Sequence, residues 1–105
     1  MKTISTDELK IMRDKNAGLT LVDTLPAESF EATRIPGAIS VPLDRSDFVA
    51  RVEQESGGKD QPVVVYCASQ ECDASEKAAR RLEIAGFTAV SRYTGGFDAW
   101  QHEAG

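Results

Sequence analysis

Short apolar runs alternate along this chain with segments of helical composition. Residues 61–66 form the most apolar run and are rich in β-branched valine, which predicts a buried strand. Residues 19–23, 39–41 and 87–92 form similar short runs. Because helical segments lie between these runs, the order favours an α/β domain with a small, mostly parallel sheet.

The expected helices have recognisable starts and stops. Ser5 and Glu8 have the spacing of a capping box, which predicts a first helix that ends at about residue 15. Composition predicts four more helices, at residues 27–33, 44–55, 75–85 and 97–103.

Length and charge limit the classes of function. A chain of 105 residues is expected to form one domain, over residues 1–105. Its net charge of -5 argues against nucleic acid or an anionic membrane as a partner, because both need a basic face. No apolar stretch reaches the ~20 residues of a membrane span, and no signal peptide is visible at the start. We therefore expect a cytoplasmic location; the sequence does not predict the oligomeric state.

Cys67 stands between the strand at 61–66 and the helix at 75–85. A thiol there can face the free N–H groups and the positive end of the helix, which favours thiolate and can hold an anion beside it. Ligands of parallel sheets bind at this carboxyl edge, and Asp23 is expected at the same edge. The alternative for Cys67 is a small buried hydrophobic residue.

The loop after Cys67 supplies the candidate substrate-binding residues. They are Ala68, Ser69, Gln70, Glu71, Cys72, Asp73 and Ala74. Cys72 could be a packed loop residue, a second sulfur carrier or a resolving thiol that forms a disulfide with Cys67. Such a disulfide needs a Cα–Cα separation below ~7 Å. His102 and the two cysteines lack the paired spacing of structural zinc, so neither a metal nor another cofactor is expected.

Several motifs together make the chain resemble a single-domain rhodanese along its whole length. The matching residues are 21–23, 35–39, 41–42, 63–67, 78–79, Leu82, 86–87 and 95–100. The resemblance implies a three-layer α/β/α fold in which Cys67 accepts a sulfane sulfur as a persulfide and passes it to a thiophilic acceptor. It also implies that the partner is a small sulfur donor or a persulfidated protein.

The chain departs from the family pattern where positive charge is usual. The family's loop arginine is replaced by Cys72 or, when the following helix is aligned, by Ala74. The arginine that usually follows the first motif is replaced by Leu25, and Arg34 stands where histidine is common. Because a guanidinium binds small oxyanions bidentately, we expect weak turnover of thiosulfate. The alternative function is a non-enzymatic binding module or a thiol redox switch of the two cysteines.

Three residues are expected to support the loop. Asp23 is predicted to cap the turn after its strand or to order the active-site loops. Arg34 is either an ordinary surface arginine or a source of positive charge in the cleft. Ser75 is predicted to be the N-cap of the helix after the loop. Asp73 stands where a related phosphatase would need arginine, which argues against that class.

Overall fold

The computed structural model describes residues 1–16, 18–69 and 71–103. The predicted loop residue Gln70 lies outside the described part. A five-stranded sheet with the order β1-β5-β4-β2-β3 occupies the centre, and every pairing in it is parallel. Its strands are β1 (Lys2–Ile4), β2 (Thr20–Asp23), β3 (Ile39–Ser40), β4 (Val63–Tyr66) and β5 (Val90–Tyr93). The predicted parallel α/β architecture is confirmed.

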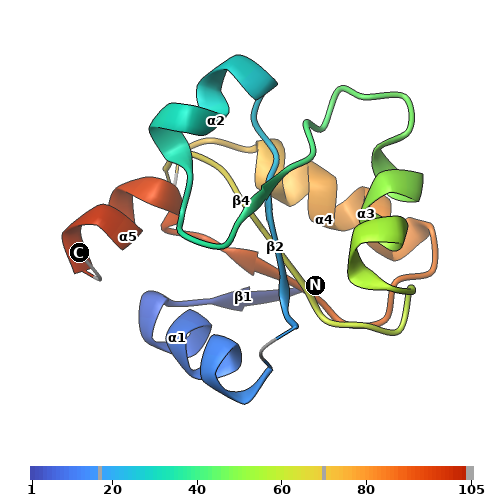
Figure 1. Cartoon of the computed structure of the whole chain (residues 1–105), viewed down its shortest axis with the longest axis horizontal. Coiled ribbons are helices and arrows are strands. Elements are labelled where there is room, and N and C mark those ends of the chain that lie inside the picture. Colours follow the sequence, from blue (N-terminus) through green and yellow to red (C-terminus); the bar gives the residue numbers. More distant parts are fainter. Residues whose placement is uncertain (17, 70, 104–105) are drawn as a thin grey trace.

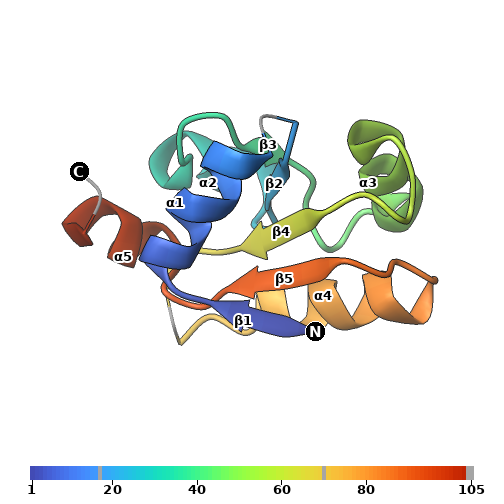
Figure 2. The same cartoon turned by 90° about the horizontal axis from the view of Figure 1, so that it is seen from below.

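Helices lie on both sides of this sheet (Figure 1 and Figure 2). The helices are α1 (Thr6–Lys15), α2 (Ala27–Thr33), α3 (Phe48–Ser56), α4 (Ala74–Ile84) and α5 (Gly96–Glu103). One hydrophobic cluster joins the sheet to α3 and α4, and a second joins it to α1 and α5. These clusters form the α/β/α layers that were predicted.

The central strand β4 supplies side chains to both clusters. Val63 and Val65 pack with α3 and α4, whereas Val64 and Tyr66 belong to the opposite cluster. All four side chains are fully buried. Since alternate residues of a strand point to opposite faces, a continuous apolar run is what a doubly covered strand requires.

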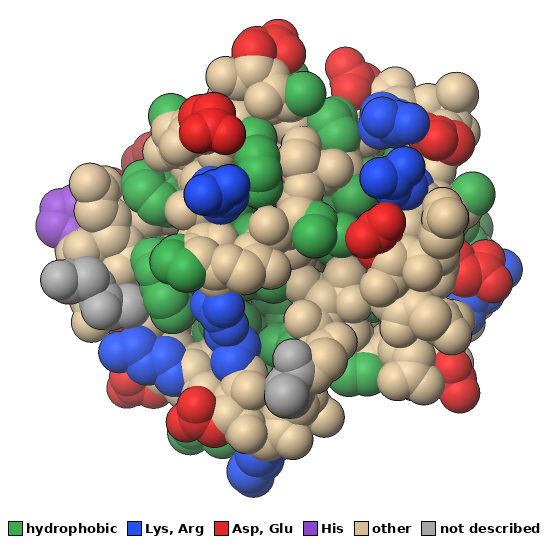
Figure 3. Space-filling model, viewed as in Figure 1, with side chains coloured by type: hydrophobic (Ala, Val, Ile, Leu, Met, Phe, Trp, Pro, Cys, Tyr) green, Lys and Arg blue, Asp and Glu red, His purple; other side chains and the backbone are tan. Residues whose placement is uncertain are grey.

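The face shown in Figure 3 carries acidic and basic side chains interspersed, with hydrophobic side chains between them. In the part of the chain that the structure describes, every helix is too short or too polar to span a bilayer.

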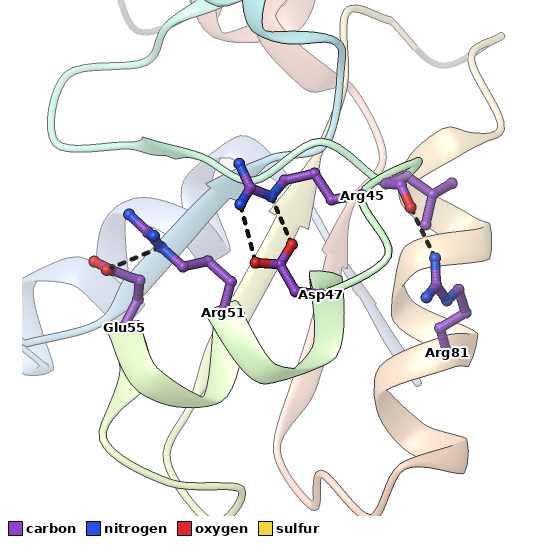
Figure 4. Close-up of polar contacts among 6 residues, drawn as sticks. Arg45, Asp47, Arg51, Glu55 and Arg81 are labelled. Atoms are coloured by element: carbon purple, nitrogen blue, oxygen red, sulfur yellow. Dashed lines mark hydrogen bonds and ion pairs between the residues drawn. The ribbon is translucent and has the colours of Figure 1, made fainter.

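The strand β1 and the start of α3 differ from the prediction. The first strand, β1, was missed because only Ile4 of its three residues is buried. The helix expected from residue 44 begins at Phe48, because a turn precedes it in which the Phe48 N–H donates to the Arg45 carbonyl at 3.2 Å. Both guanidinium contacts of Arg45 in this turn go to the Asp47 carboxylate (Figure 4).

Candidate active site

Cys67 directly follows β4 at the carboxyl end of the central strand, and its side chain is 1% exposed. The N-terminus of α5 holds the backbone around it. The Phe97 N–H donates to the Cys67 carbonyl at 3.0 Å, and the Asp98 N–H donates to the Ala68 carbonyl at 2.8 Å. Two donors that a helix start leaves free therefore position the first residues of the loop.

Gly96 makes this close approach possible. Its φ of 64° lies in the left-handed region, and a Cβ at this position would overlap the carbonyl oxygen of Cys67. Only glycine satisfies both conditions without displacing the backbone. Gly96 thus allows α5 to pack directly against the cysteine loop.

Ser75 lies beside the cysteine and does not cap α4 as predicted. The helix begins one residue earlier, at Ala74, and its N-cap Asp73 makes no side-chain cap hydrogen bond. Ser75 is therefore inside the first turn and buried, with its Oγ 3.7 Å from the Cys67 Sγ. Ser75 is thus two residues past the N-cap, and its hydroxyl lies beside the sulfur and not at the end of the helix.

Arg92 of β5 is the polar residue that the sequence analysis missed. Its Nε donates to the Ser75 Oγ at 2.9 Å, and its Nη2 donates to the Cys72 carbonyl at 3.2 Å. The parallel register places Arg92 beside Val65, two residues before Cys67. An arginine inside an otherwise buried strand was the available signal. Arg92 thus supplies a guanidinium to the loop, in which other residues occupy the positions where the family usually has arginine.

The Arg92–Ser75 contact prepares a donor for sulfur. Because the Ser75 oxygen accepts from Arg92, its own hydroxyl proton remains available to a Cys67 thiolate. A charge-assisted hydrogen bond of this kind favours the ionised sulfur.

Replacing Arg92 with methionine should therefore lower thiol reactivity. In a Cys72→Ser background, which keeps Cys67 reduced, we expect its alkylation by iodoacetamide at neutral pH to slow about tenfold. The rate should recover at higher pH. Arg80→Met is the matched control, because Arg80 is exposed on α4 and pairs with Glu76 at 3.2 Å. Equal alkylation rates in the two variants at every pH would contradict this role of Arg92.

Cys72 forms a disulfide with Cys67 in the structure. The Cα atoms of the two cysteines are 6.4 Å apart, which is below the limit of ~7 Å for a disulfide. Cys72 is half-buried, whereas Cys67 is buried. The loop thus brings its two sulfurs together and leaves the second one more accessible.

The other predicted loop residues surround this pair. Ala68 and Ser69 are half-buried, and Glu71 and Asp73 are exposed. Asp73 pairs with Lys77 at 3.4 Å, so the acidic charge at the rim is partly compensated. Ala74, predicted as a loop residue, is the first residue of α4.

An apolar pocket opens beside the loop. Its volume is ≈ 360 Å³, and its lining residues are Thr24, Leu25, Pro26, Leu43, Asp44 and Ala74. Leu25 and Ala74 are two of the positions where the resemblance leads us to expect arginine, and both meet in this pocket. Thr24 connects it to the cysteine strand, since its N–H and hydroxyl both donate to the Tyr66 carbonyl, at 3.1 and 3.0 Å.

Arg81 binds one of the residues that line the pocket. Its Nη1 donates to the Leu43 carbonyl at 2.7 Å, which ties α4 to the segment before α3 (Figure 4). This hydrogen bond holds Leu43, a lining residue of the pocket, to α4, which contributes Ala74 to the same lining.

Asp23 orders the connection after β2. It is fully buried, and its carboxylate accepts from the Leu25 N–H at 3.1 Å and the Thr33 hydroxyl at 2.6 Å. Burial raises the pKa of Asp23 above its usual value, and these hydrogen bonds partly offset the increase. Asp23 therefore holds the segment between β2 and α2, which contains Leu25, in place.

Arg34 is an exposed residue at the C-terminal end of α2. Its guanidinium lies over the Phe30 ring, 5.7 Å from the centroid. Among the described residues, no three His, Cys, Asp or Glu side chains gather into a potential metal site.

Comparisons with known proteins agree with this architecture. A family model described as Rhodanese-like domain matches residues 5–103. The HTH-type transcriptional regulator Rv0324 of Mycobacterium tuberculosis is 33% identical over 93 residues, which are 88% of this chain and 39% of that protein. The adenylyltransferase and sulfurtransferase UBA4 of Candida albicans is 30% identical over 87 residues, which are 79% of this chain and 19% of that protein.

The chain thus spans less than half the length of these two curated relatives. Among solved structures, the rhodanese-like domain of the Anabaena protein Alr3790 superimposes with a TM-score of 0.81 at 27% identity. That match covers 100% of this chain and 76% of the other. The chain belongs to the rhodanese-like domain family, whose members include sulfurtransferases.

Proposed function

We propose that this protein is a sulfurtransferase that carries a sulfane sulfur on Cys67. The proposal rests on the environment of the Cys67 Sγ. This atom lies at the carboxyl end of β4, 3.7 Å from the Ser75 hydroxyl, which Arg92 polarises. Thiolates are the reactive form of cysteine, and such surroundings produce them. The reduced form of the Cys67–Cys72 pair is the active one.

Transfer takes two balanced steps. The Cys67 thiolate attacks the outer sulfur of a persulfide donor, and the remaining donor thiolate leaves. The persulfide then presents its terminal sulfur to an acceptor thiolate or cyanide, and Cys67 leaves as thiolate. In both steps the leaving or attacking Cys67 thiolate is stabilised by the Ser75 hydroxyl, which Arg92 holds.

A single-turnover experiment tests this function. Reduced Cys72→Ser protein, in which no second thiol can attack the persulfide, is treated with glutathione persulfide, freed of small molecules and then mixed with cyanide. We expect the intact chain to gain the mass of one sulfur atom and to lose it as thiocyanate. Failure to acquire sulfur from glutathione persulfide, thiosulfate and a persulfidated protein would support the binding-module alternative instead.

The apolar pocket makes thiosulfate a poor donor. Leu25 and Ala74 line it without offering hydrogen-bond donors from their side chains to an oxyanion. A persulfide needs less positive charge, because its terminal sulfur carries a single negative charge. We therefore propose persulfides as the preferred donors.

Ala74→Arg should increase thiosulfate turnover, because it puts a guanidinium at the start of α4. We expect kcat/KM for thiosulfate to increase about tenfold, which corresponds to about 1.4 kcal/mol of added transition-state stabilisation. Ala74→Met is the matched control, since it adds comparable bulk without charge. An equal gain in the methionine variant, or efficient thiosulfate use by the wild type, would contradict this explanation.

The disulfide favours a second candidate, a thiol redox switch. In that role the pair would respond to oxidants, and no sulfane sulfur would pass through Cys67. The single-turnover experiment separates the two functions, because a pure switch gives no thiocyanate.

A further inference from the structure

Sulfur transfer to an outside acceptor requires only Cys67, yet the site also contains Cys72 beside it. The Cys72 backbone is held at two points: its N–H donates to the Ser69 carbonyl at 3.2 Å, and its carbonyl accepts from Arg92 at 3.2 Å. The same arginine reaches Ser75 beside Cys67. Hydrogen bonds therefore hold the Cys72 backbone and the Ser75 hydroxyl beside Cys67. The Cα atoms of the two cysteines are 6.4 Å apart.

We propose that Cys72 converts the Cys67 persulfide into sulfide, so that the protein also reduces sulfane sulfur. This inference rests on the proposed function. Its carrying observation is that the two sulfurs are directly bonded in the structure, which places Cys72 within reach of the sulfur that would bear the persulfide.

The step is a thiol–disulfide exchange within the loop. The Cys72 thiolate attacks the Cys67 Sγ, and the new Sγ–Sγ bond replaces the bond to the sulfane sulfur. The sulfane sulfur takes both electrons of the broken bond and leaves as hydrosulfide. Two cysteines are oxidised and one sulfane sulfur is reduced, so no further oxidant is needed.

The difference in burial between Cys67 and Cys72 determines which sulfur of the disulfide an external thiol attacks. Cys67 is 1% exposed, whereas Cys72 is half-buried and faces less obstruction. A small thiol or a dithiol protein would therefore attack the Cys72 sulfur and release Cys67 as the thiolate. A second thiol then frees Cys72, and the cycle consumes two thiols for each sulfide.

Sulfide release and outward transfer compete for one intermediate. An acceptor that meets the Cys67 persulfide before Cys72 attacks receives the sulfur; otherwise hydrosulfide is lost. Removing the Cys72 thiol should therefore lengthen the lifetime of the persulfide and direct more sulfur to the acceptor.

The test compares wild type with Cys72→Ser and Cys72→Ala under anaerobic conditions. Each protein is reduced, loaded with glutathione persulfide, freed of all small thiols and followed by intact mass, thiol titration and sulfide assay. We expect wild type to release one sulfide per chain and lose both thiols. Both variants should keep the extra sulfur and release sulfide only when an external thiol is added.

The outcomes distinguish a failure of the Cys72 reaction from a failure of the proposed sulfurtransferase function. If wild type and both variants hold the sulfur equally long, the resolving role is overturned and the transfer function stands. Stable movement of the sulfur onto Cys72 would likewise overturn sulfide release. If none of the three proteins acquires sulfur, both proposals fall.

Discussion

Cys67→Ser should lower sulfur transfer by about 10⁴-fold or more, because it removes the atom that forms the persulfide. The substitution exchanges sulfur for oxygen at a buried position of similar shape, so we expect the fold to persist. Steady-state transfer from glutathione persulfide to cyanide, with circular dichroism as a check of folding, measures the effect.

Cys72→Ser is the matched control for this loss. It breaks the same disulfide but leaves Cys67 in place. Its transfer rate to cyanide should equal or exceed that of wild type. If Cys67→Ser retains transfer and Cys72→Ser loses it, Cys72 is the sulfur carrier and the assignment of the nucleophile is wrong.

Gly96→Ala should damage both stability and transfer. Left-handed backbone geometry and overlap with the Cys67 carbonyl together should lower the free energy of unfolding by about 2–4 kcal/mol. In the protein that remains folded, a displaced Cys67 should transfer sulfur about 10²-fold more slowly. Urea unfolding and single-turnover kinetics measure the two effects separately.

Gly57→Ala isolates the contribution of the backbone geometry. Gly57 has a φ of 88°, but a Cβ there meets no atom within 4 Å, and the residue ends α3. We expect a loss of about 1 kcal/mol in stability and unchanged transfer. Equal losses of transfer in the two variants would show that the contact between Gly96 and the loop is unimportant.

Local pattern predicted the buried strand β4 and the position of Cys67 at its end, whereas the resemblance to the family implied the three layers. The run in β4 needed no knowledge of its neighbours to be recognised as buried, and Cys67 follows it directly. The helix after the loop was placed within one residue, but its N-cap is Asp73 and not the predicted Ser75, so Ser75 lies in the first turn. A helical side chain rotates by about 100° per residue, so a small boundary shift moves a hydroxyl from the cap to the sulfur.

Other parts of the site depend on contacts between distant residues. Arg92 reaches the loop because β5 pairs with β4 in a particular register, which composition does not encode. The pocket is apolar because Leu25 and Ala74, far apart in sequence, meet at one edge of the sheet. Spacing alone left the role of Cys72 open, since the path of the loop sets the distance between the sulfurs.

The most direct test of the account is to locate the sulfane sulfur on the chain. Cys72→Ser protein is loaded with glutathione persulfide, its free thiols are alkylated, and its peptides are sequenced by mass spectrometry. We expect an alkylated persulfide on the peptide fragment that contains Cys67. An unmodified Cys67 thiol in protein that has passed sulfur to cyanide would contradict it.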